Sequence, residues 1–310
     1  MARLVYRNPI EPNAITIRDP FVMRHGHGYY LYGTTRGAWD KSGDGFDVYF
    51  SRDLVHWSFA GDVFTRPDNA TWNQYQFWAP EVYERNGRFY MFYSANSDSG
   101  YRGIGVAIAN SPLGPFFDGP VNPITPDDRD YLDPHLVTDP GGAHWLFYND
   151  DWPAIGTETL YLQRLANDLT HAVDDAIPLI RADAADWIKP FDSKEHNIAG
   201  RIIEGACLVV GDKGTHYLMC STNGESGYCV GYFTAPALTG PYESRGLIIR
   251  NGGHNSVFLG PDGQSLYTAY HSPNGPTGAE RLHIDRLIIS PDGTLSVDQS
   301  VNEDRAIEVP

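Results

Sequence analysis

Short aromatic and β-branched segments recur along the chain, and each closely follows a glycine. The five clearest cases follow Gly28, Gly87, Gly142, Gly214 and Gly263. Segments of this composition are typical of β-strands, and a glycine between two of them is typical of a tight turn joining antiparallel strands. The pattern therefore predicts five strand–turn–strand units.

Further strand-like segments lie between these units, at Asp47–Ser51, Gly103–Ala109, Leu160–Leu165 and Tyr228–Phe233. Long amphipathic helical patterns are absent, and Ala182–Trp187 is at most one short helix. Each repeat can hold four short strands, which make one propeller blade. The chain of 310 residues is long enough for two average domains, but the repeat predicts one all-β domain over residues 1–310. The predicted fold is a five-bladed β-propeller with about four antiparallel strands per blade.

A polar or aromatic residue recurs nine or ten positions before each of the five glycines. These residues are Asp19, Trp78, Asp133, Glu204 and His254. The first strand of each propeller blade lines the central axis, so we expect the five side chains to converge on one site. Asp-Pro and Glu-Gly are also common turn dipeptides. Turns alone do not explain three carboxylates at one position of a repeat, so a functional site is favoured.

Charge and composition narrow the range of partners. The chain has 23 Lys and Arg against 39 Asp and Glu, a net charge of −16, which argues against nucleic acid and anionic membranes. No apolar stretch is long enough to span a membrane, and the basic N-terminus is followed by no hydrophobic leader, so we expect a soluble, cytoplasmic protein. A secreted mature form stays open. The chain has three cysteines and no C-x-x-C pair, which argues against a zinc site and against a disulfide framework.

Several segments, taken in order, resemble glycoside hydrolase family 43 from about Asn8 to about Leu295. They are Arg18-Asp-Pro-Phe, Ser51-Arg-Asp-Leu-Val-His-Trp, Phe77-Trp-Ala-Pro-Glu-Val, Ser111-Pro-Leu-Gly-Pro-Phe, Leu132-Asp-Pro-His, Ile203-Glu-Gly-Ala and Gly253-His-Asn-Ser-Val-Phe. The resemblance implies a five-bladed propeller that hydrolyses glycosidic bonds with inversion at the anomeric carbon. It also implies that no cofactor is needed for the chemistry.

Asp19, Asp133 and Glu204 are called the axial trio below, and the resemblance implies a role for each of these carboxylates. Asp19 would be the general base, Glu204 the general acid, and Asp133 would orient the acid and raise its pKa. An inverting glycosidase needs an acid and a base on opposite faces of the sugar, separated by room for a water molecule. A third carboxylate beside the acid keeps the acid protonated through like-charge repulsion.

The resemblance also implies substrate-binding residues. Trp78 would offer a flat face to the sugar, although core packing explains a tryptophan equally well. His254 would touch Ca²⁺ or another ion in the central channel through water, or would form hydrogen bonds beside Asp133 and Glu204. The chain has no Asp-x-Asp-x-Asp run that would build an oxygen cage for such an ion.

Other residues are candidates for contact with the substrate. Arg281 would reach the subsite, with Arg286 as the rival, and a solvated arginine is the common alternative. Asn149, Asp150 and Trp152 would line the rim or form a turn. The segment Trp39–Phe46 would form a loop on the same face.

The favoured activity is that of an exo-acting α-L-arabinofuranosidase on plant-type pentose oligosaccharides, which are neutral partners. Two observations favour it: the chain ends at Pro310 without the C-terminal β-sandwich of many family xylosidases, and it shows no leader. A β-D-xylosidase, an endo-arabinanase or a galactan-active enzyme stays open. A fructan-cleaving propeller is disfavoured because the acid is followed by Gly205 rather than cysteine. A non-catalytic sugar-binding propeller is the alternative from another class.

Overall fold

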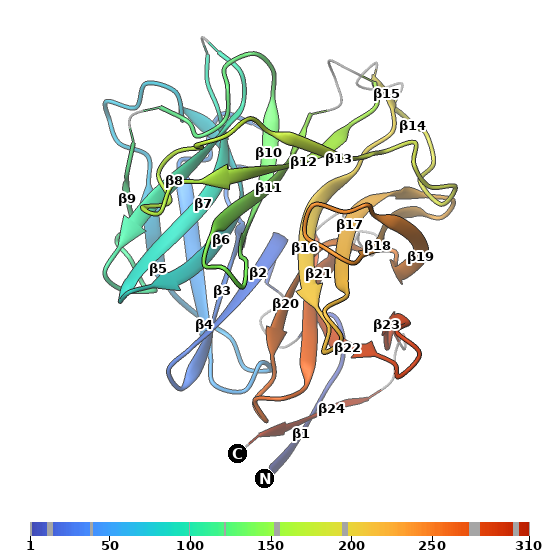
Figure 1. The fold of residues 1–310 in the computed structure, drawn as a ribbon. Helices are drawn as coiled ribbons and strands as arrows, with labels where there is room; N and C mark the ends of the chain where they lie inside the picture. Colours follow the sequence, from blue (N-terminus) through green and yellow to red (C-terminus); the bar gives the residue numbers. More distant parts are fainter. Residues whose placement is uncertain are drawn as a thin grey trace.

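The structure is a computed structural model that describes residues 2–10, 15–37, 40–98, 100–120, 122–151, 156–193, 198–272, 280–299 and 304–309. These residues form five four-stranded antiparallel sheets arranged as the blades of a propeller (Figure 1). The described part of the chain contains no helix with the length and apolar character needed to cross a membrane. The predicted five-bladed β-propeller is confirmed.

Each blade uses four strands that are consecutive in the sequence and pair in chain order. The strands are β2 (Arg18–His25), β3 (Gly28–Thr34), β4 (Gly45–Ser51) and β5 (Ser58–Thr65) in blade 1; β6 (Tyr75–Arg85), β7 (Arg88–Asn96), β8 (Gly103–Ala109) and β9 (Phe117–Asp118) in blade 2; β10 (Tyr131–Thr138), β11 (His144–Asp150), β12 (Thr159–Leu165) and β13 (Ile177–Arg181) in blade 3; β16 (Glu204–Val210), β17 (His216–Gly224), β18 (Gly227–Ala235) and β19 (Glu243–Arg250) in blade 4; β20 (Gly253–Leu259), β21 (Leu266–Ser272), β22 (Arg281–Ile289) and β23 (Leu295–Val297) in blade 5.

The hydrophobic core is divided among the five junctions between neighbouring blades. Each apolar cluster takes most of its buried residues from two adjacent blades, and connecting segments supply the others. Between blades 1 and 2, for example, the Phe46 ring meets the Phe77 ring edge to face, with centroids 5.9 Å apart. Because both faces of a blade are buried in this way, the inner strands are nearly continuous runs of aromatic and aliphatic residues. This explains the repeated aromatic segments of the sequence.

Two short two-stranded sheets lie outside the blades. β1 (Ala2–Tyr6) pairs with β24 (Arg305–Val309), so the two ends of the chain lie side by side (Figure 1). The Tyr6 hydroxyl donates to the Ile284 carbonyl of blade 5 at 2.8 Å, which fastens this pair to the propeller. β14 (Phe191–Ser193) and β15 (Ile198–Gly200) form the second pair, between blades 3 and 4.

The first strand of every blade carries a β-bulge at the same place. In blade 1, Arg18 pairs with Thr34 and Phe21 with Tyr32, which leaves one extra residue on β2. The bulged residues have left-handed backbones, with φ between 46° and 59°, and are Asp19, Ala79, Asp133, Gly205 and His254. Bulges turn a side chain away from the direction that the strand would give it. They therefore set where the axial side chains point.

The bulges correct one prediction, that Trp78 and Glu204 are equivalent to Asp19, Asp133 and His254. Trp78 and Glu204 each precede the bulged residue of their own blade. The glycine count misaligned Trp78 because Gly28 is the first residue of β3, whereas Gly87 lies in the turn before β7. The axis is therefore lined from two successive positions of the repeat.

The predicted loop Trp39–Phe46 is also partly wrong. β4 begins at Gly45, and Phe46 is fully buried in the core between blades 1 and 2. Residues 40–44 form turns and irregular backbone, as predicted, while Trp39 lies outside the described residues. Phe46 enters the strand because an aromatic side chain gains more from burial than from exposure in a loop.

Candidate active site

Asp19 is buried at the start of β2 and is held by three other side chains. The Thr34 hydroxyl donates to Asp19 Oδ2 at 2.6 Å, and His254 Nδ1 lies 3.1 Å from Oδ1. The backbone N–H of Asp19 donates to His271 Nδ1 at 3.1 Å. These contacts come from blades 1 and 5, so Asp19 sits where the propeller ring closes.

Charge fixes the ionisation of Asp19 and His254. Burial alone would raise the pKa of Asp19, but the charges of His254 and Arg18 hold it far below its usual range. Burial disfavours a charged His254, yet Asp19 and Asp133 raise the pKa of His254 to about 10. At neutral pH the site therefore contains an ionised Asp19 paired with an imidazolium.

Asp133 occupies the bulge of β10 and faces the same histidine. Its Oδ2 lies 3.7 Å from His254 Nδ1 and accepts the backbone N–H of Gly205 at 3.1 Å. Its own N–H donates to Ser94 Oγ at 3.0 Å. Burial raises the pKa of Asp133 to about 6, with His254 opposing the rise and Asp19 adding to it.

Glu204 is the first residue of β16 and is partly exposed. The Tyr228 hydroxyl donates to Glu204 Oε1 at 2.6 Å. Burial, followed by the charge of Asp133, raises the pKa of Glu204 to about 7. The structure thus brings together one carboxylate that stays ionised and one carboxyl that keeps its proton to near neutrality, which is the division needed for general acid–base chemistry.

A further carboxyl beside Glu204, that of Glu158, was missed by the sequence reasoning. Its side chain is fully buried, and Oε2 accepts the backbone N–H of Ile203 at 2.6 Å, next to Glu204. Burial and the charge of Glu204 raise its pKa well above the usual range. Glu158 lies outside the repeat that identified the trio. The only available signal was a carboxylate just before the apolar strand Thr159–Leu165.

Arg18 is an arginine beside Asp19 and Glu204, and the sequence analysis did not propose it. Arg18 Nη1 forms an ion pair with Glu280 Oε1 at 2.9 Å, and its charge acts on both Asp19 and Glu204. Arg281 begins β22 and is partly buried, with its backbone bridged to Thr16. The rival Arg286 is exposed near the opposite end of β22, where it donates to Ser265 Oγ at 3.1 Å.

Trp78 is partly exposed and lies against a buried guanidinium. The Arg102 guanidinium carbon is 3.6 Å from the centre of the Trp78 ring. Arg102 Nη2 also donates to Gln76 Oε1 at 3.2 Å, and Nε lies 3.5 Å from a carboxylate oxygen of Asp151. Cation–π stacking of this kind fixes the plane of the indole ring.

The predicted rim residues of blade 3 lie deeper than expected. Asn149 is fully buried in β11, so it does not line the rim. Asp150 is also buried, and its carboxylate accepts the Thr159 N–H at 2.6 Å and the Tyr161 hydroxyl at 3.1 Å. Both belong to the strand because their neighbours continue the ladder with β10 and β12. Trp152 lies outside the described residues.

The channel ion predicted near His254 would meet a ring whose Nδ1 is already engaged by the carboxylates of Asp19 and Asp133. Only Nε2 of this ring could then face a water molecule or an ion. Within the described ranges, no three His, Cys, Asp or Glu side chains are grouped as metal ligands. Contact of His254 with an ion through water stays a prediction.

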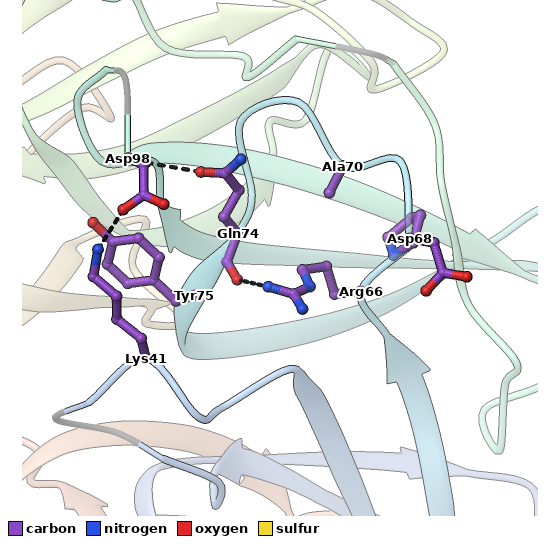
Figure 2. Close-up of a pocket in the computed structure, with 8 residues that line it drawn as sticks. Lys41, Arg66, Asp68, Ala70, Gln74, Tyr75 and Asp98 are labelled. Carbon is purple, nitrogen blue, oxygen red and sulfur yellow. Dashed lines mark hydrogen bonds and ion pairs between the residues drawn. The ribbon is translucent and has the colours of Figure 1, made fainter.

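A polar hollow of about 270 Å³ opens over blades 1 and 2 (Figure 2). Lys41 forms an ion pair with Asp98 and lies 4.2 Å from the centre of the Tyr75 ring, while Arg66 donates to the Gln74 carbonyl. These residues lie in or next to the connections that follow β3, β5 and β7, at the same end of the propeller as Asp19. The hollow therefore borders the face that carries the trio.

Curated proteins with similar sequences act on sugars. The extracellular exo-α-(1→5)-L-arabinofuranosidase ArbA of Cellvibrio japonicus is 24% identical over 279 residues, which cover 79% of this chain and 72% of that protein. The β-D-galactofuranosidase xynD of Aspergillus niger is 25% identical, and the match covers 85% of this chain and 75% of that protein.

Solved structures and a family match agree with these relatives. A thermostable family-43 glycoside hydrolase is 30% identical with a TM-score of 0.83, covering 96% of this chain and 97% of that one. The endo-arabinase of Bacteroides thetaiotaomicron is 29% identical with a TM-score of 0.81, covering 92% and 98%. Residues 6–295 match the family described as Glycosyl hydrolases family 43. The chain is a glycosidase, and it belongs to glycoside hydrolase family 43.

Proposed function

We propose that the enzyme cleaves its substrate with inversion, with Asp19 as the general base, Glu204 as the general acid and Asp133 as the residue that orients the acid. The observation that carries this proposal is the difference in protonation state between the carboxyl groups of Asp19 and Glu204. Asp19 is held ionised by His254, and the pKa of Glu204 is raised to about 7 by burial and by Asp133. An inverting mechanism needs this pair of states in one site.

The proposed reaction is a single displacement. Glu204 gives its proton to the glycosidic oxygen as the bond from that oxygen to the anomeric carbon breaks. Asp19 takes a proton from a water molecule whose oxygen forms the new bond on the opposite face of the sugar. The product is the free sugar of inverted configuration and the alcohol of the leaving group, so the two carboxyl groups end in exchanged protonation states. Trp78, held by Arg102, is the proposed flat contact for the sugar ring.

For the substrate, we propose a non-reducing terminal α-L-arabinofuranosyl residue of a neutral pentose oligosaccharide. The name of the Cellvibrio relative supports this choice, and the Bacteroides endo-arabinase shares the same sugar. β-D-Xylosides and galactofuranosides are the alternatives. The test is a panel of nitrophenyl α-L-arabinofuranoside, β-D-xyloside and β-D-galactofuranoside, with arabino-oligosaccharides labelled at the reducing end to separate exo from endo cleavage. No turnover of any of them would favour a sugar-binding propeller.

Inversion itself can be observed directly. Hydrolysis followed by proton NMR is expected to show first the sugar anomer opposite to that of the substrate, because one displacement occurs at the anomeric carbon. The mutarotated mixture should appear only later. Spectra of the same sugar dissolved alone provide the rate of mutarotation as the control. First appearance of the anomer that matches the substrate would contradict the single-displacement mechanism.

Removing the Tyr228 hydroxyl is expected to shift the alkaline limb of the pH dependence of kcat/KM. Glu204 must be protonated to act, so activity should fall as pH rises through about 7. The Tyr228 hydrogen bond favours the ionised form of Glu204 and lowers its pKa. Tyr228→Phe should therefore raise the pKa of Glu204 and move the alkaline limb to higher pH by about one unit, the size expected for a hydrogen bond to a charged group.

Tyr242→Phe is the matched control for this shift, because its hydroxyl donates to the Leu238 carbonyl of the same blade, with no contact to the trio among the described residues. Its profile should match that of the wild type. A limb that stays in place in Tyr228→Phe, or that moves to lower pH, would show that Glu204 is not the group titrating there.

A further inference from the structure

Side chains from one blade fasten the bulge of the next blade. At four junctions, a polar side chain near the end of the second strand accepts the backbone N–H of the next bulged residue. The pairs are Thr34 with Ala79 at 2.9 Å, Ser94 with Asp133 at 3.0 Å, Ser221 with His254 at 2.6 Å, and His271 with Asp19 at 3.1 Å. The four acceptors are equivalent in register, because each pairs with the residue that precedes the bulge of its own blade.

The junction between blades 3 and 4 departs from this pattern. The equivalent acceptor is Asn149, which pairs with Leu132. The Gly205 N–H instead donates to Asp133 Oδ2 at 3.1 Å, while Asn149 Oδ1 is buried without a hydrogen-bond partner among the described residues. The carboxylate of Asp133 therefore holds the bulge of blade 4, which a neighbouring polar side chain does at the other junctions. A group proposed for catalysis thus also belongs to the set of hydrogen bonds that hold the bulges.

The junction between blades 5 and 1 differs in the kind of acceptor that it uses. Hydroxyl groups serve at the other three junctions of the common pattern, so a hydroxyl is sufficient to hold a bulge. Here the acceptor is the imidazole of His271, and Nδ1 can accept only while it carries no proton, which places the ring proton on Nε2. Nε2 lies 3.7 Å from Glu280 Oε1, the partner of Arg18.

The larger ring of His271 provides a surface that a hydroxyl lacks. Tyr228 stacks on it, with centroids 5.4 Å apart and planes inclined by 18°. A Cβ atom on Gly253, the register partner of His271, would lie 2.2 Å from the Tyr228 ring, so only glycine admits the ring at this position. The same tyrosine donates its hydroxyl to Glu204 at 2.6 Å.

We propose that His271 and Tyr228 act as one positioning unit that fixes the proposed general base and the proposed general acid relative to each other. His271 holds the main chain of Asp19, Tyr228 holds the carboxyl of Glu204, and the ring stack joins the two. The proposal rests on the roles proposed above for Asp19 and Glu204. It explains why an imidazole stands where a serine or threonine hydroxyl would fasten the bulge.

The test compares His271→Asn with His271→Leu, assayed on the aryl glycoside that the wild type hydrolyses. The two side chains are similar in size, but only asparagine offers an acceptor near the Nδ1 position. His271→Leu should lower kcat by about 100-fold, the cost of a small misplacement of a reacting group, with KM within about threefold of the wild type. His271→Asn should recover at least about tenfold of that loss.

A matched pair at His283 controls for general damage to blade 5. His283 lies on β22 against Tyr270, and the described residues show it no contact with the trio. His283→Leu and His283→Asn should have equal kcat values close to that of the wild type. Thermal unfolding midpoints separate misfolding from mispositioning. Equal kcat values for the two His271 variants, both folded, would overturn the proposal.

The stack is tested separately by Tyr228→Phe and Tyr228→Leu, which also decide the question if His271→Leu does not fold. Both remove the hydroxyl, but only leucine removes the ring that supports His271. Tyr228→Leu should have a kcat at least about tenfold below that of Tyr228→Phe. Equal values would overturn the coupling between the two residues.

Asp19→Asn and Glu204→Gln distinguish failure of this proposal from failure of the proposed function. If those two variants keep wild-type activity, the proposed roles themselves are wrong. If they lose activity while His271→Leu and Tyr228→Leu do not, the roles stand and only the positioning unit is refuted.

Discussion

Replacing Asp19 by asparagine is expected to lower kcat by about 10³- to 10⁴-fold, the contribution of a general base, with little change in KM. The amide cannot take a proton from the attacking water. Asparagine is the sharpest substitution because Asp19 has φ of 50°, a left-handed conformation that asparagine adopts more readily than alanine. Loss of activity in Asp19→Asn therefore reports on the carboxylate and not on the bulge.

The loss in Asp19→Asn can be separated from misfolding by chemical rescue. Azide attacks the anomeric carbon without losing a proton, so it should restore part of the turnover and give a glycosyl azide of inverted configuration. Asp262→Asn is the control, since this exposed carboxylate lies in the turn between β20 and β21. Retention of more than about a tenth of wild-type kcat in Asp19→Asn would exclude Asp19 as the base.

Replacing Glu204 by glutamine is expected to cause a loss that depends on the leaving group. A sugar leaving group needs the proton of Glu204, so kcat on an oligosaccharide should fall by about 10⁴-fold. A dinitrophenolate departs without protonation, and the loss on a dinitrophenyl glycoside should be about tenfold or less. The alkaline limb of the pH profile should also disappear with the dinitrophenyl substrate.

The measurement is the ratio of the two losses in Glu204→Gln, with Asp19→Asn as the reference. Asp19→Asn should be slow on both substrates, because water must be deprotonated whatever the leaving group. A loss of equal size on both substrates in Glu204→Gln would refute its role as the acid, even if the variant is nearly inactive.

The blades and the trio could be predicted from the sequence because both depend on local pattern. Aromatic segments beside turn glycines identify the hairpins, and the Asp-Pro pairs mark the bulges of blades 1 and 3. The same signal, read strictly, would have aligned Ala79-Pro80 with those pairs and corrected the register of Trp78. A count of nine residues before Gly214 would likewise have reached Gly205.

The surroundings of the trio could not be predicted in the same way. Arg18 from blade 1 and Tyr228 from β18 act on Glu204. The charge of Glu204 in turn acts on Glu158, just before β12. The distances between these groups are set by how the chain packs in three dimensions. Asn149 was placed at the rim because it follows an aromatic strand. Only the pairing of β11 with both neighbours shows that it is buried. Periodicity along one chain carries no information about such contacts.

The junction between blades 5 and 1 has a consequence for biosynthesis. Asp19 and His271 are 252 residues apart, and His254 and Glu280 are likewise translated long after Asp19. At translation rates of about 5–20 residues per second, roughly 10–50 s pass between the synthesis of Asp19 and that of the histidines that hold its bulge and pair with its carboxylate. We therefore expect a nascent chain that has folded its early blades to lack glycosidase activity until blade 5 completes the site.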